Sequence, residues 1–267
     1  MTRIPGIDED VTVDRLAGDW TIHQLAAGHR FSADDMLVAW LAARVEPGAR
    51  RVLDLGAGIG SVGFMTLWAL RDRGPGAGQR RLTMVEAQPV SQRLAFATAA
   101  LNGLEGVVDG FVADLRELPP GIIGPYDLVT GSPPYFPLGT GKVSPHPQKA
   151  ACRMELRGTI ADYARAAAPL LSDGSFVTCF PARDPRGEAA FAPAGLHVYA
   201  SCDVVFRAGM DPMIRLYASR RTPGVRVALP TLTIRDRAGA WTPQYLDLRG
   251  EMGSPMPAPS GPPTGGG

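Results

Sequence analysis

The 267-residue sequence is poor in cysteine and has no long apolar run. Its three cysteines, Cys152, Cys179 and Cys202, are 27 and 23 residues apart and have no histidine beside them. They fit neither a zinc site nor a disulfide framework, so we expect no metal and a reducing, cytoplasmic location. No apolar run reaches the roughly 18 residues of a membrane helix, and the first 19 residues carry five acids. We therefore expect neither a membrane span nor a secretory signal.

The chain also has little net charge, formally +1 at pH 7, but its charges are unevenly distributed. Residues 1–20 have a net charge of −3, residues 136–170 have +3 and residues 203–237 have +4. A solvated surface of mixed charge explains any one such segment. Two basic segments in the second half of the chain would also suit a phosphate backbone, so both interpretations stay open.

A Ser-Pro-Pro-Tyr sequence follows a short apolar segment. Residues 126–130 predict a buried strand, and Ser132, Pro133, Pro134 and Tyr135 come directly after it. Consecutive prolines fix φ near about −65° and donate no hydrogen bond, so the strand must end there with carbonyls left as acceptors. A side-chain oxygen, a free carbonyl and an aromatic ring could together hold an exocyclic amine and stack on its base. The alternative is a plain surface turn.

A glycine-rich turn precedes this motif. Residues 51–55 predict a strand, Gly56, Gly58 and Gly60 a turn, and residues 61–70 a helix, which is how a parallel sheet brings its backbone against a ligand. Asp54, at the end of the strand, suits a cationic ligand with an amino-acid tail, such as S-adenosylmethionine, better than a pyrophosphate. A tight turn without a ligand is the alternative.

Two further acids follow predicted strands. Glu86 comes after residues 82–85 and could accept hydrogen bonds from both hydroxyls of a ribose, or it could cap a helix. Asp114 comes after residues 107–112 and could accept from an adenine amino group, or it could be an ordinary loop acid. Since parallel strands end at one edge of a sheet, we expect Asp54, Glu86, Asp114 and Ser132 to lie together.

The remaining segments suggest three parts of the chain. Residues 1–46 are predicted as a hairpin around residues 20–25 and a helix capped by Ser32, together forming a lid. Residues 47–249 are predicted as one α/β domain, with later strands near 175–180, 196–206, 213–220 and 229–235. Residues 250–267 are rich in glycine and proline and are predicted to be a disordered tail.

These motifs resemble those of the class I S-adenosylmethionine-dependent methyltransferases that modify amino groups. Members of that branch usually have Asn or Asp before Pro-Pro and Tyr or Phe. Within the branch, Arg-Phe-Ser-Ala-Asp at residues 30–34 and the segment 133–155 resemble bacterial methyltransferases that modify N6 of the adenine beside the anticodon of valine tRNA. The main departure is Ser132, where that family usually has Asn.

The resemblance implies a Rossmann-like α/β fold, with a mostly parallel seven-stranded sheet, helices on both faces and an antiparallel C-terminal edge. It implies S-adenosylmethionine as cofactor and a tRNA substrate, and we expect a monomer. The cofactor-binding residues it implies are Asp34, Asp54, Gly56, Ala57, Gly58, Gly60, Glu86, Ala87, Asp114 and Ser132. The catalytic residues are Ser132, Pro133, Pro134 and Tyr135, and the substrate contacts are Phe136, Lys142, Lys149 and Arg153.

Two other functions stay open at this point. A protein glutamine N5-methyltransferase would hold a side-chain amide at the same turn. A catalytically weak methyltransferase fold that only binds RNA is the second alternative, because Ser132 replaces the usual Asn.

Overall fold

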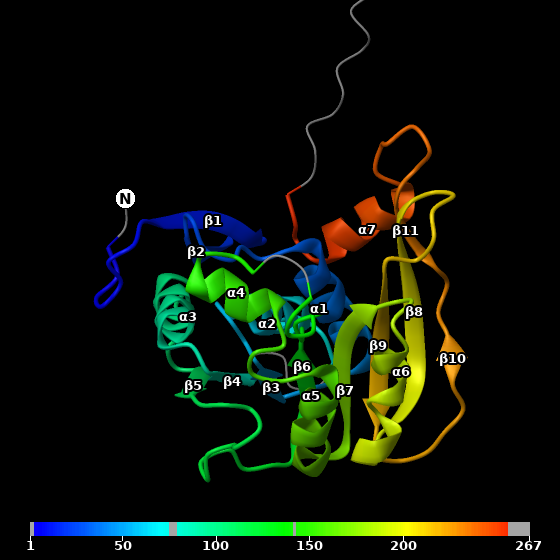
Figure 1. The fold of residues 1–267 in the computed structure, drawn as a ribbon, viewed down its shortest axis with the longest axis horizontal. Helices are drawn as coiled ribbons and strands as arrows, with labels where there is room; N and C mark the ends of the chain where they lie inside the picture. The colour runs from blue at the N-terminus through cyan, green and yellow to red at the C-terminus, as the bar shows by residue number, and fades with distance from the viewer. Residues whose placement is uncertain (1–2, 75–78, 141–142, 256–267) are drawn as a thin grey trace, which may run out of the picture.

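The structure, a computed structural model, describes residues 3–74, 79–140 and 143–255. Within these residues the chain forms one large sheet, a separate hairpin of β1 and β2, and helices around the sheet (Figure 1). The strands are β1 (Val11–Ala17), β2 (Trp20–Leu25), β3 (Arg51–Leu55), β4 (Arg81–Glu86), β5 (Val108–Val112), β6 (Tyr126–Gly131), β7 (Leu171–Pro181), β8 (His197–Arg207), β9 (Ile214–Arg220), β10 (Val227–Ala228) and β11 (Leu232–Arg235). The α-helices are α1 (Ala33–Val45), α2 (Ser61–Leu70), α3 (Pro89–Leu101), α4 (Pro147–Arg153), α5 (Ile160–Ala167), α6 (Pro185–Ala189) and α7 (Pro243–Glu251).

The large sheet has the order β5-β4-β3-β6-β7-β9-β8, with β10 and β11 on the outer edge of β8. Within the group β3 to β7, each strand runs parallel to the strands beside it. Strand β9 is antiparallel to both β7 and β8. The predicted α/β fold with an antiparallel C-terminal edge is confirmed. The predicted number of seven strands is wrong, because the described part of the sheet has nine. The two additional strands are short and occupy successive stretches of the one free edge of β8.

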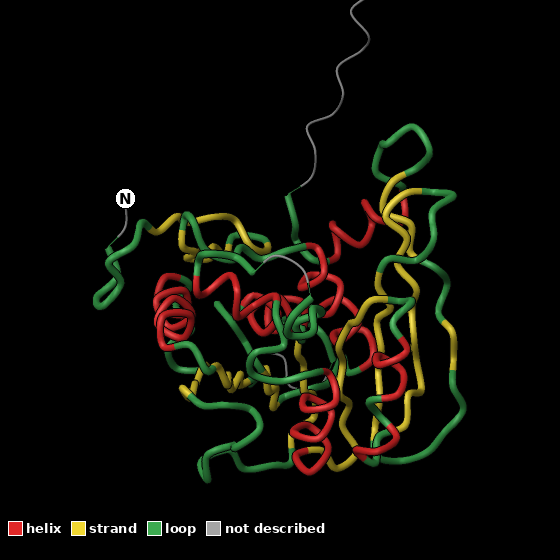
Figure 2. The backbone as a smooth tube through the Cα atoms, in the orientation of Figure 1, coloured by secondary structure: helices red, strands yellow, loops and turns green. Residues whose placement is uncertain are grey.

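The sheet separates two hydrophobic cores. Neighbouring residues on one strand belong to different cores, for example Val52 and Leu53 on β3, because successive side chains point to opposite faces. Helices α1 and α2 contribute to the first core, and α5 contributes to the second. Figure 1 shows α5 and α6 over the near face, and Figure 2 shows helices on both sides of the strands. Parallel strands buried on both faces explain the apolar strand sequences.

The N-terminal hairpin is attached to α3 by side-chain hydrogen bonds. The backbone N–H of Thr21 donates to Asn102 at 2.9 Å, and that of His23 donates to Thr98 at 3.0 Å. Helix α1 is capped by Ser32, as predicted, and Ser32 forms a capping box with Asp35. The helix then packs on α2 and on β7. Helix α1, which precedes the glycine turn in the sequence, therefore lies against the part of the sheet that contains the predicted site.

The end of the described chain is helical and packed. Helix α7, which the sequence did not predict, extends two residues into the predicted tail, and its last turn is followed by Gly253. The carbonyl of Gly253 accepts a 2.7 Å hydrogen bond from the N–H of Gly18, between β1 and β2. Residues 256–267 of the predicted tail lie outside the described residues. Among the described residues, no helix has both the length and the apolar character needed to cross a membrane.

Gly253 provides a test of this packing. It has φ +58°, and a Cβ atom there would lie 2.4 Å from the Trp68 ring. We expect Gly253→Ala to lower the free energy of unfolding by about 2 kcal/mol or more, measured by urea denaturation. Gly250 is the matched control, because it is helical and a Cβ atom there would meet nothing within 4 Å. Gly250→Ala should raise stability by up to about 1 kcal/mol. Equal effects of the two substitutions would contradict the packing described here.

Candidate functional site

A cavity of about 380 Å³ lies at the carboxyl edge of β3, β4 and β6. This is the edge at which open α/β sheets bind their ligands, and the volume is in the range of small-molecule sites. Most residues predicted for the site line this cavity: Asp34, Asp54, Gly56, Ala57, Gly58, Glu86, Ala87, Ser132, Pro133, Pro134, Tyr135, Phe136 and Arg153. The motifs at residues 54–58, 86–87 and 132–136, far apart in sequence, therefore meet around one space.

Asp54 lies at the floor of the cavity and connects strand β3 with strand β6 and helix α2. It is completely buried at the end of β3. Its Oδ1 accepts from the Thr130 hydroxyl on β6 at 2.8 Å, and its Oδ2 accepts from the Gly63 N–H on α2 at 3.0 Å. Burial raises the pKa of Asp54 to about 7, although both hydrogen bonds act in the opposite direction. The carboxyl thus already has a partner within the chain for each oxygen.

The glycine turn and Glu86 form one side of the cavity. Gly56 and Gly58 both have positive φ, which strains any residue with a side chain. The N–H of Gly58 donates to Glu86 Oε2 at 2.8 Å, and the N–H of Gln88 donates to Oε1 at 2.7 Å. Glu86 is buried, and burial raises the pKa of its carboxyl. A Cβ atom on Gly58 would meet nothing within 4 Å, so there is room for a ligand against this turn.

The Ser-Pro-Pro-Tyr turn forms the opposite side. The Tyr135 hydroxyl donates to Asp34 Oδ2 at 3.0 Å and also lies 3.0 Å from the Cys179 sulfur. The Tyr135 ring meets Phe180 edge to face, with 5.6 Å between ring centroids. Burial raises the pKa of Tyr135 well above its ordinary value, so its hydroxyl remains protonated and can donate. The ring is thereby fixed at both its hydroxyl end and its edge.

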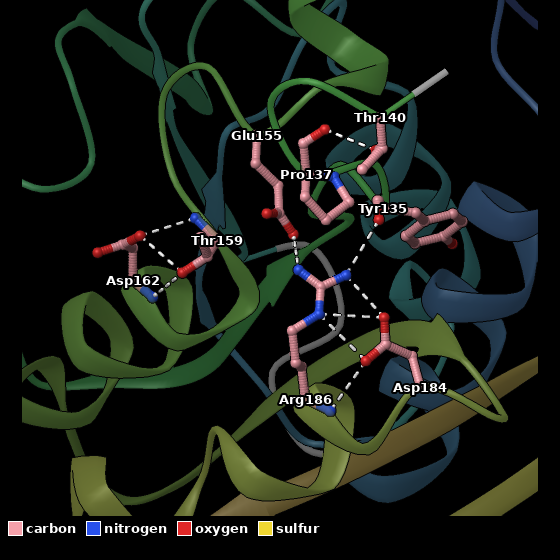
Figure 3. Close-up of polar contacts among 8 residues, drawn as sticks. All are labelled: Tyr135, Pro137, Thr140, Glu155, Thr159, Asp162, Asp184 and Arg186. Carbon is pink, nitrogen blue, oxygen red and sulfur yellow. Dashed lines mark hydrogen bonds and ion pairs between the residues drawn. The ribbon is translucent and has the colours of Figure 1, made fainter.

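Arg186, on α6, supports this turn from outside the cavity (Figure 3). Its guanidinium donates to the Tyr135 carbonyl at 3.3 Å and to Glu155 Oε1 at 2.7 Å. It also forms an ion pair with Asp184, the N-cap of its own helix. Figure 3 shows these partners converging on one guanidinium. Arg186 therefore links the turn after β6 to the segment that follows α4, a contact between distant segments that no local sequence pattern indicated.

Two neighbouring acids at the start of α1 complete the cavity wall. Asp34 and Asp35 both line it, and burial raises the pKa of each carboxyl. Asp35 was not among the residues predicted for the site. Its Oδ2 accepts from the Ser61 hydroxyl at 2.9 Å, so it also contacts the residue after the glycine turn. Its position directly after Asp34 was the available sequence signal.

Other lining residues were not predicted from the sequence. They are distributed along the chain and include His29, Gln88, Cys152, Arg157 and Tyr163. Tyr163, on α5, approaches the glycine turn closely enough that a Cβ atom on Gly56 would lie 2.0 Å from its hydroxyl. No role in the site was predicted for any of these residues, and only the folded chain brings them to the cavity.

Four predicted residues are not among the lining residues. The Asp114 side chain pairs with the exposed Arg116. Gly60 packs against Phe64 and Met84 below the turn. Lys149 is half-buried on α4, and Lys142 lies outside the described residues. The roles predicted for these four residues stay predictions.

Solved methyltransferase structures share this fold. No family model matches the chain. The crystal structure of a predicted O-methyltransferase from Agrobacterium tumefaciens matches with a TM-score of 0.60 and 20% identity, covering 83% of this chain and 97% of that one. The chain has the fold of the class I methyltransferases. The structure of P. horikoshii TYW2 in complex with MeSAdo also matches this methyltransferase fold, with a TM-score of 0.51 and 13% identity over 79% of this chain and 72% of that one.

One similar protein is named for the reaction that it catalyses. The tRNA1(Val) (adenine(37)-N6)-methyltransferase of Pasteurella multocida is 25% identical over 203 residues, which are 75% of this chain and 80% of that protein. The resemblance predicted from the sequence is therefore confirmed, and the comparisons support a methyltransferase. Among the described residues, no group of three or more His, Cys, Asp or Glu side chains could hold a metal ion.

The raised pKa of Asp54 predicts a pH effect on stability. Between the ordinary value of 3.8 and the folded value of about 7, the folded protein holds a proton that the unfolded chain has released. The free energy of unfolding should therefore fall as pH rises through this interval, by up to about 1.4 kcal/mol per pH unit from this group.

Asp54→Asn removes this proton but can still accept from Gly63 and donate to Thr130. Its stability relative to wild type should rise with pH across the same interval and level off above it, measured by urea denaturation at several pH values. A difference that does not depend on pH would contradict the shift.

Proposed function

We propose that the chain transfers a methyl group from S-adenosylmethionine to N6 of an adenine beside the anticodon of a tRNA of the valine type. The methyltransferase fold and the similarity to the P. multocida enzyme support methyl transfer. One observation supports the assignment to an adenine amine. Ser132, Pro133 and Tyr135 lie on the wall of a cavity that also contains the glycine turn. We propose that the enzyme acts in the cytoplasm as a monomer.

The cavity suits a cationic nucleoside cofactor. Its glycine side leaves open space at Gly58, where a ligand can approach the backbone. Its acidic residues, Asp34, Asp35 and Glu86, complement positive charge, and a cation beside them would favour their ionised forms. Glu86 is placed at the end of β4, as expected for an acceptor of ribose hydroxyls. When bound, S-adenosylmethionine supplies the methyl group from a sulfonium cation.

The Pro-Pro turn suits an exocyclic amine. The lone pair of such an amine is conjugated with its ring, so the nitrogen is a poor nucleophile. In the proposed complex, Ser132 Oγ and the Pro133 carbonyl accept its two protons, which draws the nitrogen toward tetrahedral geometry and directs its lone pair at the methyl group. Among the described residues, none donates a hydrogen bond to the Pro133 carbonyl, so this acceptor is available. Tyr135 stacks on the base, and Phe136, 46% exposed, forms a second wall.

Basic side chains beside the cavity suit an RNA substrate. Arg153 and Arg157 line the cavity, and neither forms an ion pair within the described part of the chain. Lys149 is half-buried on α4, one helical turn before the exposed Arg153. In the proposed complex these residues, with Lys142, contact phosphates near the target base.

Methyl transfer to tRNA gives the direct test. Unfractionated tRNA incubated with the protein and labelled S-adenosylmethionine should contain N6-methyladenosine, detected by mass spectrometry of the nucleosides. Tyr135→Ala should lower the rate by about 10- to 100-fold, since stacking on one base is worth about 1–3 kcal/mol. Tyr135→Phe is the matched control, because it keeps the ring and loses only the hydroxyl, with its contacts to Asp34 and Cys179. It should retain most of the activity.

A protein substrate is the other outcome of this test. Labelled methyl found on the glutamine amide of a release factor, and absent from tRNA, would replace the proposed function by a protein glutamine methyltransferase. Transfer to neither acceptor would leave only the RNA-binding alternative.

Two glycine-to-alanine variants test whether S-adenosylmethionine binds beside the glycine turn. Gly58 and Gly103 have φ +57° and +68°, and a Cβ atom on either would meet nothing within 4 Å. Both Ala variants should therefore lose about 1 kcal/mol of stability from backbone strain. Gly58 lines the cavity, whereas Gly103 lies beyond the far end of α3. Only Gly58→Ala should weaken S-adenosylmethionine binding, by about 10-fold or more in calorimetry. Equal affinities in the two variants would place the donor elsewhere.

A further inference from the structure

The turn that is proposed to hold the base is paired with the segment that follows α4. The N–H of Phe136 donates to the carbonyl of Arg153 at 3.2 Å, and the carbonyl of Phe136 accepts from the N–H of Glu155 at 2.9 Å. Phe136 and Met154 are thus partners in an isolated parallel bridge. The bridge holds Arg153, a proposed phosphate contact, close to Tyr135, the proposed stacking ring. A bridge of only two hydrogen bonds is a weak connection on its own.

Arg186 closes this connection from α6 (Figure 3). Its Nη1 donates to Glu155 Oε1 at 2.7 Å, and its Nη2 donates to the carbonyl of Tyr135 at 3.3 Å. Tyr135 is bonded covalently to Phe136, and the carbonyl of Phe136 accepts from the N–H of Glu155. These four residues therefore form a closed ring of contacts, in which the guanidinium spans the two segments that the bridge joins.

The ion pair between Arg186 and Glu155 is shielded from water on one side. The side chain of Glu155 is only 7% exposed, whereas that of Arg186 is 39% exposed. A carboxylate in such a position loses much of its hydration and needs a charged or hydrogen-bonding partner. Among the described residues, Arg186 supplies the only ion pair of this carboxylate. Glu155 is therefore held to Arg186, and the segment after α4 is held with it.

Capping of α6 does not account for these contacts. Asp184 is the N-cap of that helix, and its side chain accepts from the backbone N–H of Arg186 at 3.0 Å. The same carboxylate accepts from Nε and Nη2 of the guanidinium, at 3.1 and 2.6 Å. This pairing is local and would be complete without Tyr135 or Glu155. Its effect is to orient the guanidinium, so that the two terminal nitrogens reach the two distant acceptors.

We propose that Arg186 is a positioning residue for methyl transfer, which holds the Pro-Pro turn at a fixed distance from the segment after α4. The inference rests on the proposed function, because it takes the amine of the base to be held at that turn. A base that stacks on Tyr135, with a phosphate bound by Arg153, is oriented only if these two residues keep their separation. A displacement of about 1 Å can lower a rate by about 100-fold. Arg186 does not line the cavity and acts only through Tyr135 and Glu155.

Arg186→Lys tests this role. A lysine keeps the positive charge, but its single ammonium group cannot serve Tyr135, Glu155 and Asp184 together, as the planar fork of an arginine does. We expect kcat for tRNA methylation to fall by about 10-fold or more, with the Kd of S-adenosylmethionine changed less than about 3-fold. Rates are expressed per S-adenosylmethionine site counted by calorimetry, so that unfolded protein does not lower them.

Arg183→Lys is the matched control. Arg183 lies three residues earlier in the chain, its side chain is 73% exposed, and it pairs with the exposed Asp211. An ion pair in water contributes little to structure. Arg183→Lys should therefore change kcat less than about 3-fold. An equal loss of kcat in the two variants would contradict the role of Arg186.

Glu155→Ala tests whether the ring of contacts acts as a unit. Without this carboxylate the ring is already open, so adding Arg186→Lys should lower kcat by less than about 3-fold further. Two results would overturn the inference. One is the same loss of kcat with and without Glu155, which would show that Arg186 does not act through the segment after α4. The other is a loss of S-adenosylmethionine affinity as large as the loss of kcat, which would mean that Arg186 supports the whole cavity.

A measurement without substrate separates this inference from the proposed function. Amide hydrogen exchange, followed by nuclear magnetic resonance, reports the opening of the bridge through the N–H groups of Phe136 and Glu155. Arg186→Lys should speed their exchange by about 10-fold or more and should change that of the Gly58 N–H, on the glycine side, less than about 3-fold. Unchanged exchange at Phe136 and Glu155 overturns the inference whatever the substrate is. If exchange there is faster but the methyl group is found on a protein amide, the proposed function fails and the inference stands, with kcat then measured on that amide.

Discussion

The arrangement of the site depends on one buried carboxyl, that of Asp54. Its two oxygens accept hydrogen bonds from Thr130 on β6 and from Gly63 on α2, while its own backbone belongs to β3. Thr130 lies two residues before Ser132, and Gly63 lies in the helix that follows the glycine turn. A shift of either turn would leave a buried polar group without its partner, which costs about 1–3 kcal/mol or more. The carboxyl therefore fixes the distance between the glycine side and the Pro-Pro side of the cavity.

The cavity wall gathers acids that repel one another when all are ionised. Asp34, Asp35, Asp54 and Glu86 all line it, and burial raises the pKa of each. In the absence of a cation, this arrangement favours partial protonation. A bound cation would lower these pKa values, so its binding would be coupled to the release of protons from these carboxyls. Such a site discriminates by charge as well as by shape, which is why its acids are informative about the ligand.

The sequence predicted the parts of the fold that local patterns determine. The strands ending at Leu55, Glu86 and Gly131 were predicted because each combines a short apolar run with a residue that ends it. Their common edge followed from the geometry of parallel strands. The contacts of Arg186 with Tyr135 and Glu155 could not be predicted, because they join segments separated by 31 to 51 positions and depend on tertiary packing. Asp114 forms an ion pair with Arg116, two residues later in the chain, a local contact that the position of Asp114 after a strand did not indicate. Helix α7 was missed because Gly250 and the nearby prolines suggested a flexible segment.

The start of α1 connects local helix formation to the chemistry of the cavity. A capping box normally satisfies only the first N–H groups of a helix, and its carboxyl is replaceable by other acceptors. Here the same carboxyl of Asp35 also accepts from the Ser61 hydroxyl at 2.9 Å, so the cap and the end of the glycine turn share one acceptor. A substitution that preserved the cap but could not accept from Ser61 would keep the helix and leave the Ser61 hydroxyl without this partner. The start of α1 and the end of the glycine turn therefore constrain each other through the side chain of residue 35.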